Sequence, residues 1–160
     1  MASFGGEKAV PDTHTWLTPR FVLDALGQFD LDPCASLNRP WDTARHHYTI
    51  DDDGLSKQWF GRVWCNPPYG KAAVPFMERM ALHQCGVALL FTRTETRMFQ
   101  NLVFPYASAF LFLAGRLKFH REDGSLASTS QSPSMLIAYG DSDAKVLQDC
   151  GLNGGFVRNG

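Results

Sequence analysis

Residues 62–71, "RVWCNPPYGK", place three apolar-leaning residues directly before a rigid Asn-Pro-Pro-Tyr segment. Val63, Trp64 and Cys65 predict a short buried strand that ends at Cys65. Two consecutive prolines then prevent both a helix and a strand ladder, because proline has a fixed φ and no backbone N–H. Closing a loop does not require so stiff a segment, so residues 66–69 are a candidate site at the end of a strand.

The rest of the chain alternates between predicted strands and helices. The apolar runs "FDLD", "VALLF" and "SAFLFLA" predict further strands, and "AAVPFMERMALHQ" has the apolar spacing of a helix. Thr18 is predicted to cap a helix whose first residue is Pro19. Continuous apolar strands between helices indicate an α/β fold with a mostly parallel sheet and helices on both faces. Asp123-Gly124 predicts an antiparallel hairpin at the sheet edge.

Polar residues follow several predicted strands. Asp32, Asn66 and Thr92 lie where three strands end, and ligands of such sheets bind beyond the carboxyl ends of the strands. Roughly thirty residues separate Asp32 from Asn66, which is too few for a complete strand-helix-strand unit with its loops. We therefore expect the sheet to lack one element.

The composition is that of one globular domain. The chain has 160 residues, 44% hydrophobic residues and a net charge of −1. We expect a loose segment over residues 1–14, a single domain over 15–150 and a flexible tail over 151–160. No segment has the length of a membrane span or the layout of a signal peptide, so no membrane partner is expected. The widely spaced cysteines indicate free, mostly buried thiols in a reducing cytoplasm, and no spacing predicts a metal site.

The Asn-Pro-Pro-Tyr segment suits chemistry on an amine attached to a nucleobase. Such an amine is a poor nucleophile because its lone pair is delocalised into the ring. The side-chain oxygen of Asn66 and a neighbouring backbone carbonyl can hold both amine hydrogens, and Pro67 and Pro68 fix the direction of that carbonyl. Tyr69 offers a ring on which a base can stack, a contact worth about 1–3 kcal/mol. A rigid turn with a packed tyrosine is the alternative reading.

These residues resemble the catalytic motif of amino-methyltransferases, Asp/Asn/Ser-Pro-Pro-aromatic. The resemblance extends to one family, the small phage-type DNA N-6-adenine methyltransferases (Dam). The blocks "WLTPRFVLDALGQFDLDPCAS", "DDDGLSKQW", "WCNPPYG", "TRTETRMF", "FLAGRLKF" and "SPSMLIAY" occur in order from about residue 16 to 139. The resemblance implies a reduced Rossmann-like methyltransferase fold in the cytoplasm of a bacterium or of a phage-infected host.

The resemblance also implies roles for individual residues. The cofactor S-adenosylmethionine is expected to contact the N-terminal block, the segment after the first strand and Asn66: Trp16, Thr18, Pro19, Asp32, Pro33, Cys34 and Ala35. Catalysis is expected from Asn66, Pro67, Pro68 and Tyr69. Binding of the target adenine and its DNA is expected from Asp53, Tyr69, Arg93, Arg97, Arg116 and Lys118.

Two departures from the family pattern leave alternatives open. The cofactor block has no glycine-rich turn, and Asp32 before Pro33 also suits a simple turn. No recognition domain is inserted, so DNA recognition must come from loops 36–58 or 116–130, from a second subunit in a homodimer, or be slight. The same motif serves methylation of RNA or of protein glutamine, and a non-catalytic DNA-binding relative is a third alternative. The biological role, such as evasion of host restriction, stays open.

Overall fold

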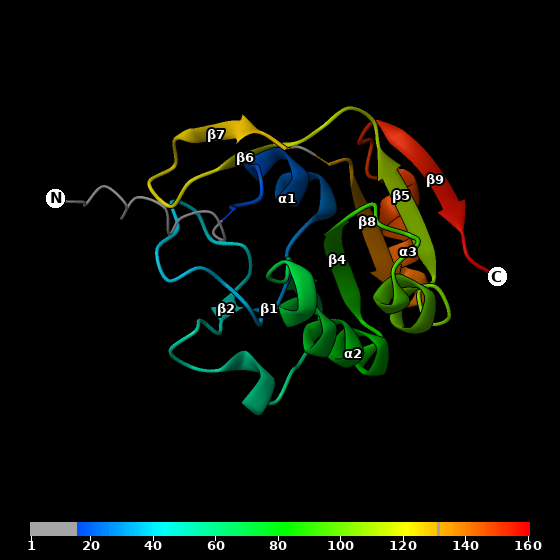
Figure 1. The fold of residues 1–160 in the computed structure, drawn as a ribbon, viewed down its shortest axis with the longest axis horizontal. Helices are drawn as coiled ribbons and strands as arrows, with labels where there is room; N and C mark the ends of the chain where they lie inside the picture. The colour runs from blue at the N-terminus through cyan, green and yellow to red at the C-terminus, as the bar shows by residue number, and fades with distance from the viewer. Residues whose placement is uncertain (1–15, 131) are drawn as a thin grey trace, which may run out of the picture.

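The computed structural model describes residues 16–130 and 132–160, so the segment expected to be loose, residues 1–14, lies outside it. A seven-stranded sheet with the order β2-β1-β3-β4-β8-β5-β9 forms the centre of the described chain (Figure 1). Its strands are β1 (Leu31–Asp32), β2 (His46–His47), β3 (Val63–Cys65), β4 (Gly86–Phe91), β5 (Ala109–Leu113), β8 (Ser134–Tyr139) and β9 (Gly154–Arg158).

Most strands of this sheet run in one direction. The pairs β2–β1, β1–β3 and β3–β4 are parallel. Strand β8 is antiparallel to both β4 and β5, so β5 runs in the same direction as β4, and β9 is antiparallel to β5. These strand directions confirm the predicted α/β class with a mostly parallel sheet.

The connection between β1 and β3 contains no complete strand-helix-strand unit, as the sequence predicted. Residues 33–62 contain β2 and the 3₁₀ helix η2 (Gly54–Ser56) but no α-helix. The two strands pair in parallel, with Leu31 opposite Val63. The ends of β1 and β3 are brought side by side by this pairing.

Helices cover both faces of the sheet. The helices α1 (Arg20–Leu26) and α3 (Asp141–Asp149) pack on one face, and α2 (Ala73–His83) and the π-helix η4 (Phe99–Val103) pack on the other. In β3 the fully buried Trp64 joins the first layer, while Val63 and Cys65 join the second, as alternation in a strand requires. None of the described helices is long and apolar enough to cross a bilayer.

The expected flexible tail is wrong, because residues 154–158 form β9 at the edge of the sheet. Phe110 lies opposite Val157 in this antiparallel pair. One of the glycines that suggested a tail, Gly154, serves close packing instead: a Cβ added there would lie 2.4 Å from the Phe112 carbonyl oxygen. Without β9, the outer edge of β5 would have unpaired backbone N–H and C=O groups. Residues 154–158 pair with these groups and therefore form a strand.

The predicted hairpin is present but lies outside the main sheet. Strands β6 (Lys118–His120) and β7 (Leu126–Thr129) form a separate two-stranded sheet, and β8, β5 and β9 provide the antiparallel edge. The hairpin pairs with the N-terminal segment through a bridge between Leu17 and His120. It thus extends over the carboxyl ends of the parallel strands rather than lengthening the sheet.

The predicted helix cap at Thr18 is also wrong. Helix α1 begins at Arg20, Pro19 occupies the N-cap position, and no side chain caps the helix. Pro19 still fits the start of the helix, because its missing N–H is one that the first turn would leave unpaired. The Thr18 hydroxyl is therefore available for another contact.

The four cysteines are free thiols. Cys65 is fully buried, Cys34 and Cys150 are half-buried, and Cys85 is exposed. Cys85, which lies between α2 and β4, therefore departs from the expectation that the thiols are mostly buried.

A buried ion pair joins the start of β3 to α3. The Arg62 Nε donates to Asp143 Oδ1 at 2.6 Å, and the Asp143 side chain is 3% exposed. Replacing Asp143 by Ala should lower the free energy of unfolding by about 3–5 kcal/mol, because it leaves the guanidinium without its buried partner. Urea denaturation measures this loss.

Asp141→Ala is the matched control in the same helix turn. The Asp141 side chain is 98% exposed and lies 3.9 Å from Arg158, so its loss should change the free energy of unfolding by no more than about 0.5 kcal/mol. Equal losses in the two variants would contradict a stabilising role for the buried pair.

Candidate active site

The Asn-Pro-Pro-Tyr segment stands between two cavities at the carboxyl edge of the sheet. The first cavity has a volume of about 620 Å³ and the second about 570 Å³. Asn66, Pro67, Pro68 and Tyr69 line both of them. Two ligands bound in these cavities would meet at this segment.

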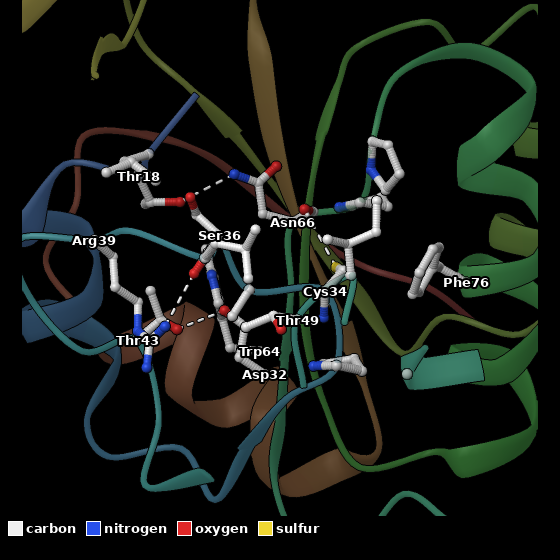
Figure 2. A pocket seen from close by; sticks show the side chains of 18 of the residues that line it. Thr18, Asp32, Cys34, Ser36, Arg39, Thr43, Thr49, Trp64, Asn66 and Phe76 are labelled. Carbon is white, nitrogen blue, oxygen red and sulfur yellow. Dashed lines mark hydrogen bonds between the residues drawn. The ribbon is translucent and has the colours of Figure 1, made fainter. Parts of the chain in front are cut away.

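The first cavity contains a buried carboxylate at the end of β1 (Figure 2). Asp32 is 4% exposed; one carboxylate oxygen accepts the Cys34 backbone N–H at 3.0 Å and the other accepts the Thr43 hydroxyl. Burial raises the pKa of Asp32 from 3.8 to about 6, although the bonds from Thr43 and Cys34 oppose this rise. Asp32 therefore stabilises the turn that follows β1 and also lines the cavity.

Backbone hydrogen bonds, rather than glycines, shape the segment after β1. Tyr48 N–H donates to the Asp32 carbonyl and Ala35 N–H donates to the Tyr48 carbonyl, both at 2.9 Å. The Cys34 thiol lies 3.9 Å from the Cys65 sulfur and donates to the Asn66 carbonyl at 3.4 Å. The contact with Cys65, together with burial, raises the pKa of Cys34, so this residue is a neutral thiol.

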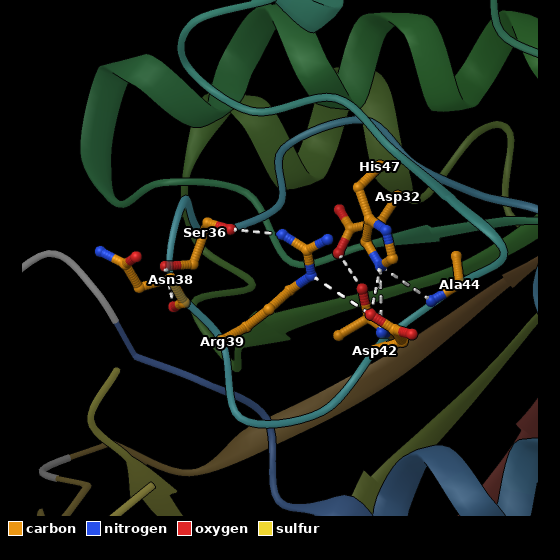
Figure 3. A network of polar contacts seen from close by, with 8 residues as sticks. Asp32, Ser36, Asn38, Arg39, Asp42, Ala44 and His47 are labelled. Carbon is orange, nitrogen blue, oxygen red and sulfur yellow. Dashed lines mark hydrogen bonds and ion pairs between the residues drawn. The ribbon is translucent and has the colours of Figure 1, made fainter. Parts of the chain in front are cut away.

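A polar network holds the loop that walls the first cavity (Figure 3). Arg39 donates to the Ser36 carbonyl at 2.9 Å and lies 3.6 Å from Asp42. His47 Nε2 accepts the backbone N–H groups of Thr43 and Ala44, and burial followed by the charge of Arg39 lowers its pKa. This histidine, at the end of β2, is thus a neutral acceptor for the loop.

No described part of the chain gathers three or more His, Cys, Asp or Glu side chains in an arrangement that could hold a metal ion.

The Asn66 side chain has a defined orientation. Its Nδ2 donates to the Trp16 carbonyl at 3.3 Å and to the Thr18 hydroxyl at 3.2 Å, the latter drawn in Figure 2. A carbonyl oxygen only accepts, so the amine end of the amide must face it. Oδ1 is consequently turned away from Trp16 and is available as an acceptor at the junction of the cavities.

The second cavity is aromatic and mostly apolar. The Tyr69 ring stacks on Phe91 with a centroid distance of 4.9 Å and an interplanar angle of 11°, and Phe91 meets Phe119 edge-on. Burial raises the pKa of Tyr69 to about 12, so its hydroxyl is neutral at physiological pH. Ser134 Oγ is buried at this cavity and has no hydrogen-bond partner within the described part of the chain.

The structure brings most of the predicted cofactor residues together. The first cavity is lined by Trp16, Thr18, Asp32, Pro33, Cys34, Ala35 and Asn66. Pro19 lines neither cavity, because it turns the chain into α1.

The predicted substrate residues are more dispersed. Tyr69 and Arg93 line the second cavity, but Asp53 lines the first, in a left-handed backbone conformation with φ of 57°. Arg97, Arg116 and Lys118 are exposed and line neither cavity.

Sequence reasoning did not identify several residues of the site. Thr43 and Arg39 reach the first cavity from the loop after β1, and Glu122 reaches it from the hairpin, where it accepts the Ser36 hydroxyl at 2.7 Å. No local motif marks these contacts, since each joins segments far apart in the chain. Phe91 had a usable signal, because it is an aromatic residue at the end of an apolar strand.

A family model described as DNA N-6-adenine-methyltransferase (Dam) matches residues 6–145 of the chain. No curated protein sequence and no solved structure matches the chain.

The buried carboxyl group of Asp32 predicts a pH-dependent cost in stability. It should lose its proton near pH 3.8 in the unfolded chain and near pH 6 in the folded protein. The folded state thus binds the proton more tightly, so the free energy of unfolding contributed by this group falls as pH rises from about 4 to 6, by roughly 3 kcal/mol. Asp32→Asn removes this fall.

We therefore expect Asp32→Asn to be more stable than the wild type at pH 8 and to lose that advantage near pH 4. Urea denaturation of both proteins at the two pH values measures the difference, and other titrating groups cancel in the comparison. A difference in stability that is the same at both pH values would contradict the assignment of the raised pKa to Asp32.

Proposed function

The chain belongs to the DNA N-6-adenine-methyltransferase (Dam) family, and from this premise we propose that it transfers a methyl group from S-adenosylmethionine to N6 of adenine in DNA. The observation that carries this proposal is the position of residues 66–69, which line two neighbouring cavities at once. A methyl transfer needs two ligands whose reacting atoms meet at one point.

We assign the first cavity to the cofactor. S-adenosylmethionine is a sulfonium with an ammonium group, and when bound it supplies an activated methyl group. The lining carboxylates of Asp32, Asp53 and Glu122 suit these positive charges. Trp16, Trp41 and Phe76 supply apolar surface for an adenosine group. The fit rests on these side chains and not on a glycine-rich turn.

We assign the second cavity to the target adenine. Asn66 Oδ1 and the Pro67 carbonyl accept the two hydrogens of the amine and direct its lone pair toward the first cavity. The base stacks on the Tyr69 ring, which is 36% exposed and held in its plane by Phe91. In duplex DNA the amine is paired and enclosed, so the base must be flipped out to reach this cavity.

The reaction requires neither a covalent intermediate nor a dedicated base. Displacement at a sulfonium carbon depends mainly on positioning of the two reactants. The cysteine nearest to Asn66 in sequence, Cys65, is fully buried on the α2 face of the sheet. Asn66 and the Pro67 carbonyl thus act as acceptors that orient the nucleophile.

Exposed cations supply the contacts with DNA phosphates. Arg93 lies at the second cavity, and Arg97, Arg116 and Lys118 are exposed. Each phosphate contact releases counterions, so a protein with few such contacts binds DNA weakly and with a shallow salt dependence. A homodimer would double this basic surface and compensate for the lack of an inserted recognition domain.

Methyl transfer tests the proposal directly. Purified protein incubated with S-adenosylmethionine and duplex DNA should produce N6-methyladenine, measured by mass spectrometry of the digested DNA. Asn66→Ala should lower the rate at least about 100-fold, because it removes one of the two acceptors that orient the amine. Its neighbour Cys65→Ala should stay within a few-fold of the wild type, with a stability cost of about 1–2 kcal/mol for the lost core contacts.

Two outcomes would count against this function. Wild-type protein that binds S-adenosylmethionine but yields no N6-methyladenine would refute adenine in DNA as the substrate. A folded Cys65→Ala protein that is as inactive as Asn66→Ala would show that the thiol, not the amide, is essential.

A further inference from the structure

The amide of Asn66 is fixed by residues of the N-terminal segment, about fifty positions earlier in the chain. Its Nδ2 donates to the main-chain oxygen of Trp16 and to the hydroxyl oxygen of Thr18, at 3.3 and 3.2 Å. Thr18 is 2% exposed, so this contact lies away from bulk water. Sequence alone assigned Thr18 to the helix cap and to the cofactor, whereas the structure places its hydroxyl against the proposed catalytic amide (Figure 2).

We propose that the Trp16 carbonyl and the Thr18 hydroxyl form a positioning pair that sets the orientation of the Asn66 amide and makes position 66 specific for asparagine. This inference rests on the proposed function, because the orientation matters only if Asn66 Oδ1 accepts a hydrogen from the substrate amine.

The orientation of the amide decides what Asn66 offers to the substrate. With Nδ2 bound to the positioning pair, Oδ1 faces the junction of the cavities and accepts an amine hydrogen. A rotation of the amide by half a turn would place Oδ1 against the Trp16 carbonyl, and two acceptors would then face each other. It would also present the Nδ2 hydrogens to the amine hydrogens of the substrate, so a flipped Asn66 could not hold the amine.

The positioning pair is itself held by contacts outside α1. Leu17 exchanges backbone hydrogen bonds with His120 of β6, at 2.8 and 3.0 Å. The Trp41 indole N–H donates to the Thr18 carbonyl at 3.2 Å, and the Trp41 ring meets the His120 ring edge-on. The hairpin and Trp41 thus fix the backbone from which both acceptors reach Asn66.

The same geometry discriminates between asparagine and aspartate. An aspartate at position 66 would turn a carboxylate oxygen toward the Trp16 carbonyl, and neither atom carries a hydrogen. The Thr18 hydroxyl can donate to a carboxylate, but the main-chain carbonyl cannot. A carboxylate oxygen against the Trp16 carbonyl is repelled and lacks a hydrogen-bond partner there, so the carboxylate would rotate away from the productive position.

Three variants test the pair: Thr18→Val, Thr18→Ser and Asn66→Asp. For each, kcat for formation of N6-methyladenine is measured at saturating S-adenosylmethionine and DNA, the cofactor Kd is measured by calorimetry, and folding is checked by thermal denaturation. Valine keeps the shape of threonine without its hydroxyl, so Thr18→Val should lower kcat about 5- to 10-fold, the equivalent of one hydrogen bond. The cofactor Kd should change by less than about twofold, because the lost bond acts on the transition state.

The other two variants separate this role from packing. Thr18→Ser keeps the hydroxyl and should recover most of the lost kcat. Asn66→Asp should lower kcat at least about tenfold, although it keeps one acceptor oxygen and nearly the same volume.

The contrary results are equally specific. A Thr18→Val protein with unchanged kcat would refute the positioning role, and so would one whose only defect is weaker cofactor binding. Full activity in Asn66→Asp would refute the specificity for asparagine. If the wild type itself forms no N6-methyladenine, the proposed function fails and this role fails with it, whereas an active wild type isolates the positioning role.

Discussion

The direct pairing of β1 with β3 is the contact on which the site depends. The two strands pair in parallel and therefore end at the same edge of the sheet, and residues 33–62 join them without an α-helix. Asp32 and Asn66 therefore follow adjacent strands, and the Cys34 thiol reaches the Asn66 carbonyl. Pro67 and Pro68 then stop the ladder, so that the chain leaves the sheet between the two cavities instead of continuing over one of them.

The site contains buried polar groups that lower the stability of the fold. A carboxylate at position 32 is buried and titrates near pH 6, and a hydroxyl at position 134 lacks a partner within the described residues. Buried polar groups of this kind gather at functional sites more often than elsewhere. A row of aromatic rings, from Tyr69 through Phe91 and Phe119 to Trp16, joins the two cavities.

Sequence reasoning predicted the features that depend on local pattern. The strand ends at Asp32, Cys65 and Phe91 follow from apolar runs stopped by polar or proline residues, and the structure confirms all three. Sequence reasoning did not predict structure that depends on contacts between segments far apart in the chain. The tail pairs as β9 because β5 leaves an open edge. Thr18 has the residue type of a helix cap, yet its hydroxyl contacts Asn66.

Loop conformation is the second feature that the sequence did not predict. Asp53 lies in an acidic motif that suggested the target base, and the turn after β2, in which its backbone is left-handed, places it at the first cavity. A close approach holds this turn, since a Cβ on the neighbouring Gly54 would lie 2.0 Å from the Pro33 carbonyl oxygen. Such a contact joins two loops and has no signature in either one.

A crystal structure of the protein with S-adenosylhomocysteine and an adenine-containing oligonucleotide would show whether each cavity binds its own ligand. We predict that the cofactor product lies in the first cavity, against residues 32–35. A flipped adenine should lie in the second, with N6 within hydrogen-bond distance of Asn66 Oδ1. Density for S-adenosylhomocysteine in the second cavity, beside Phe91 and Ser134, would show that the two ligands are assigned to the wrong cavities.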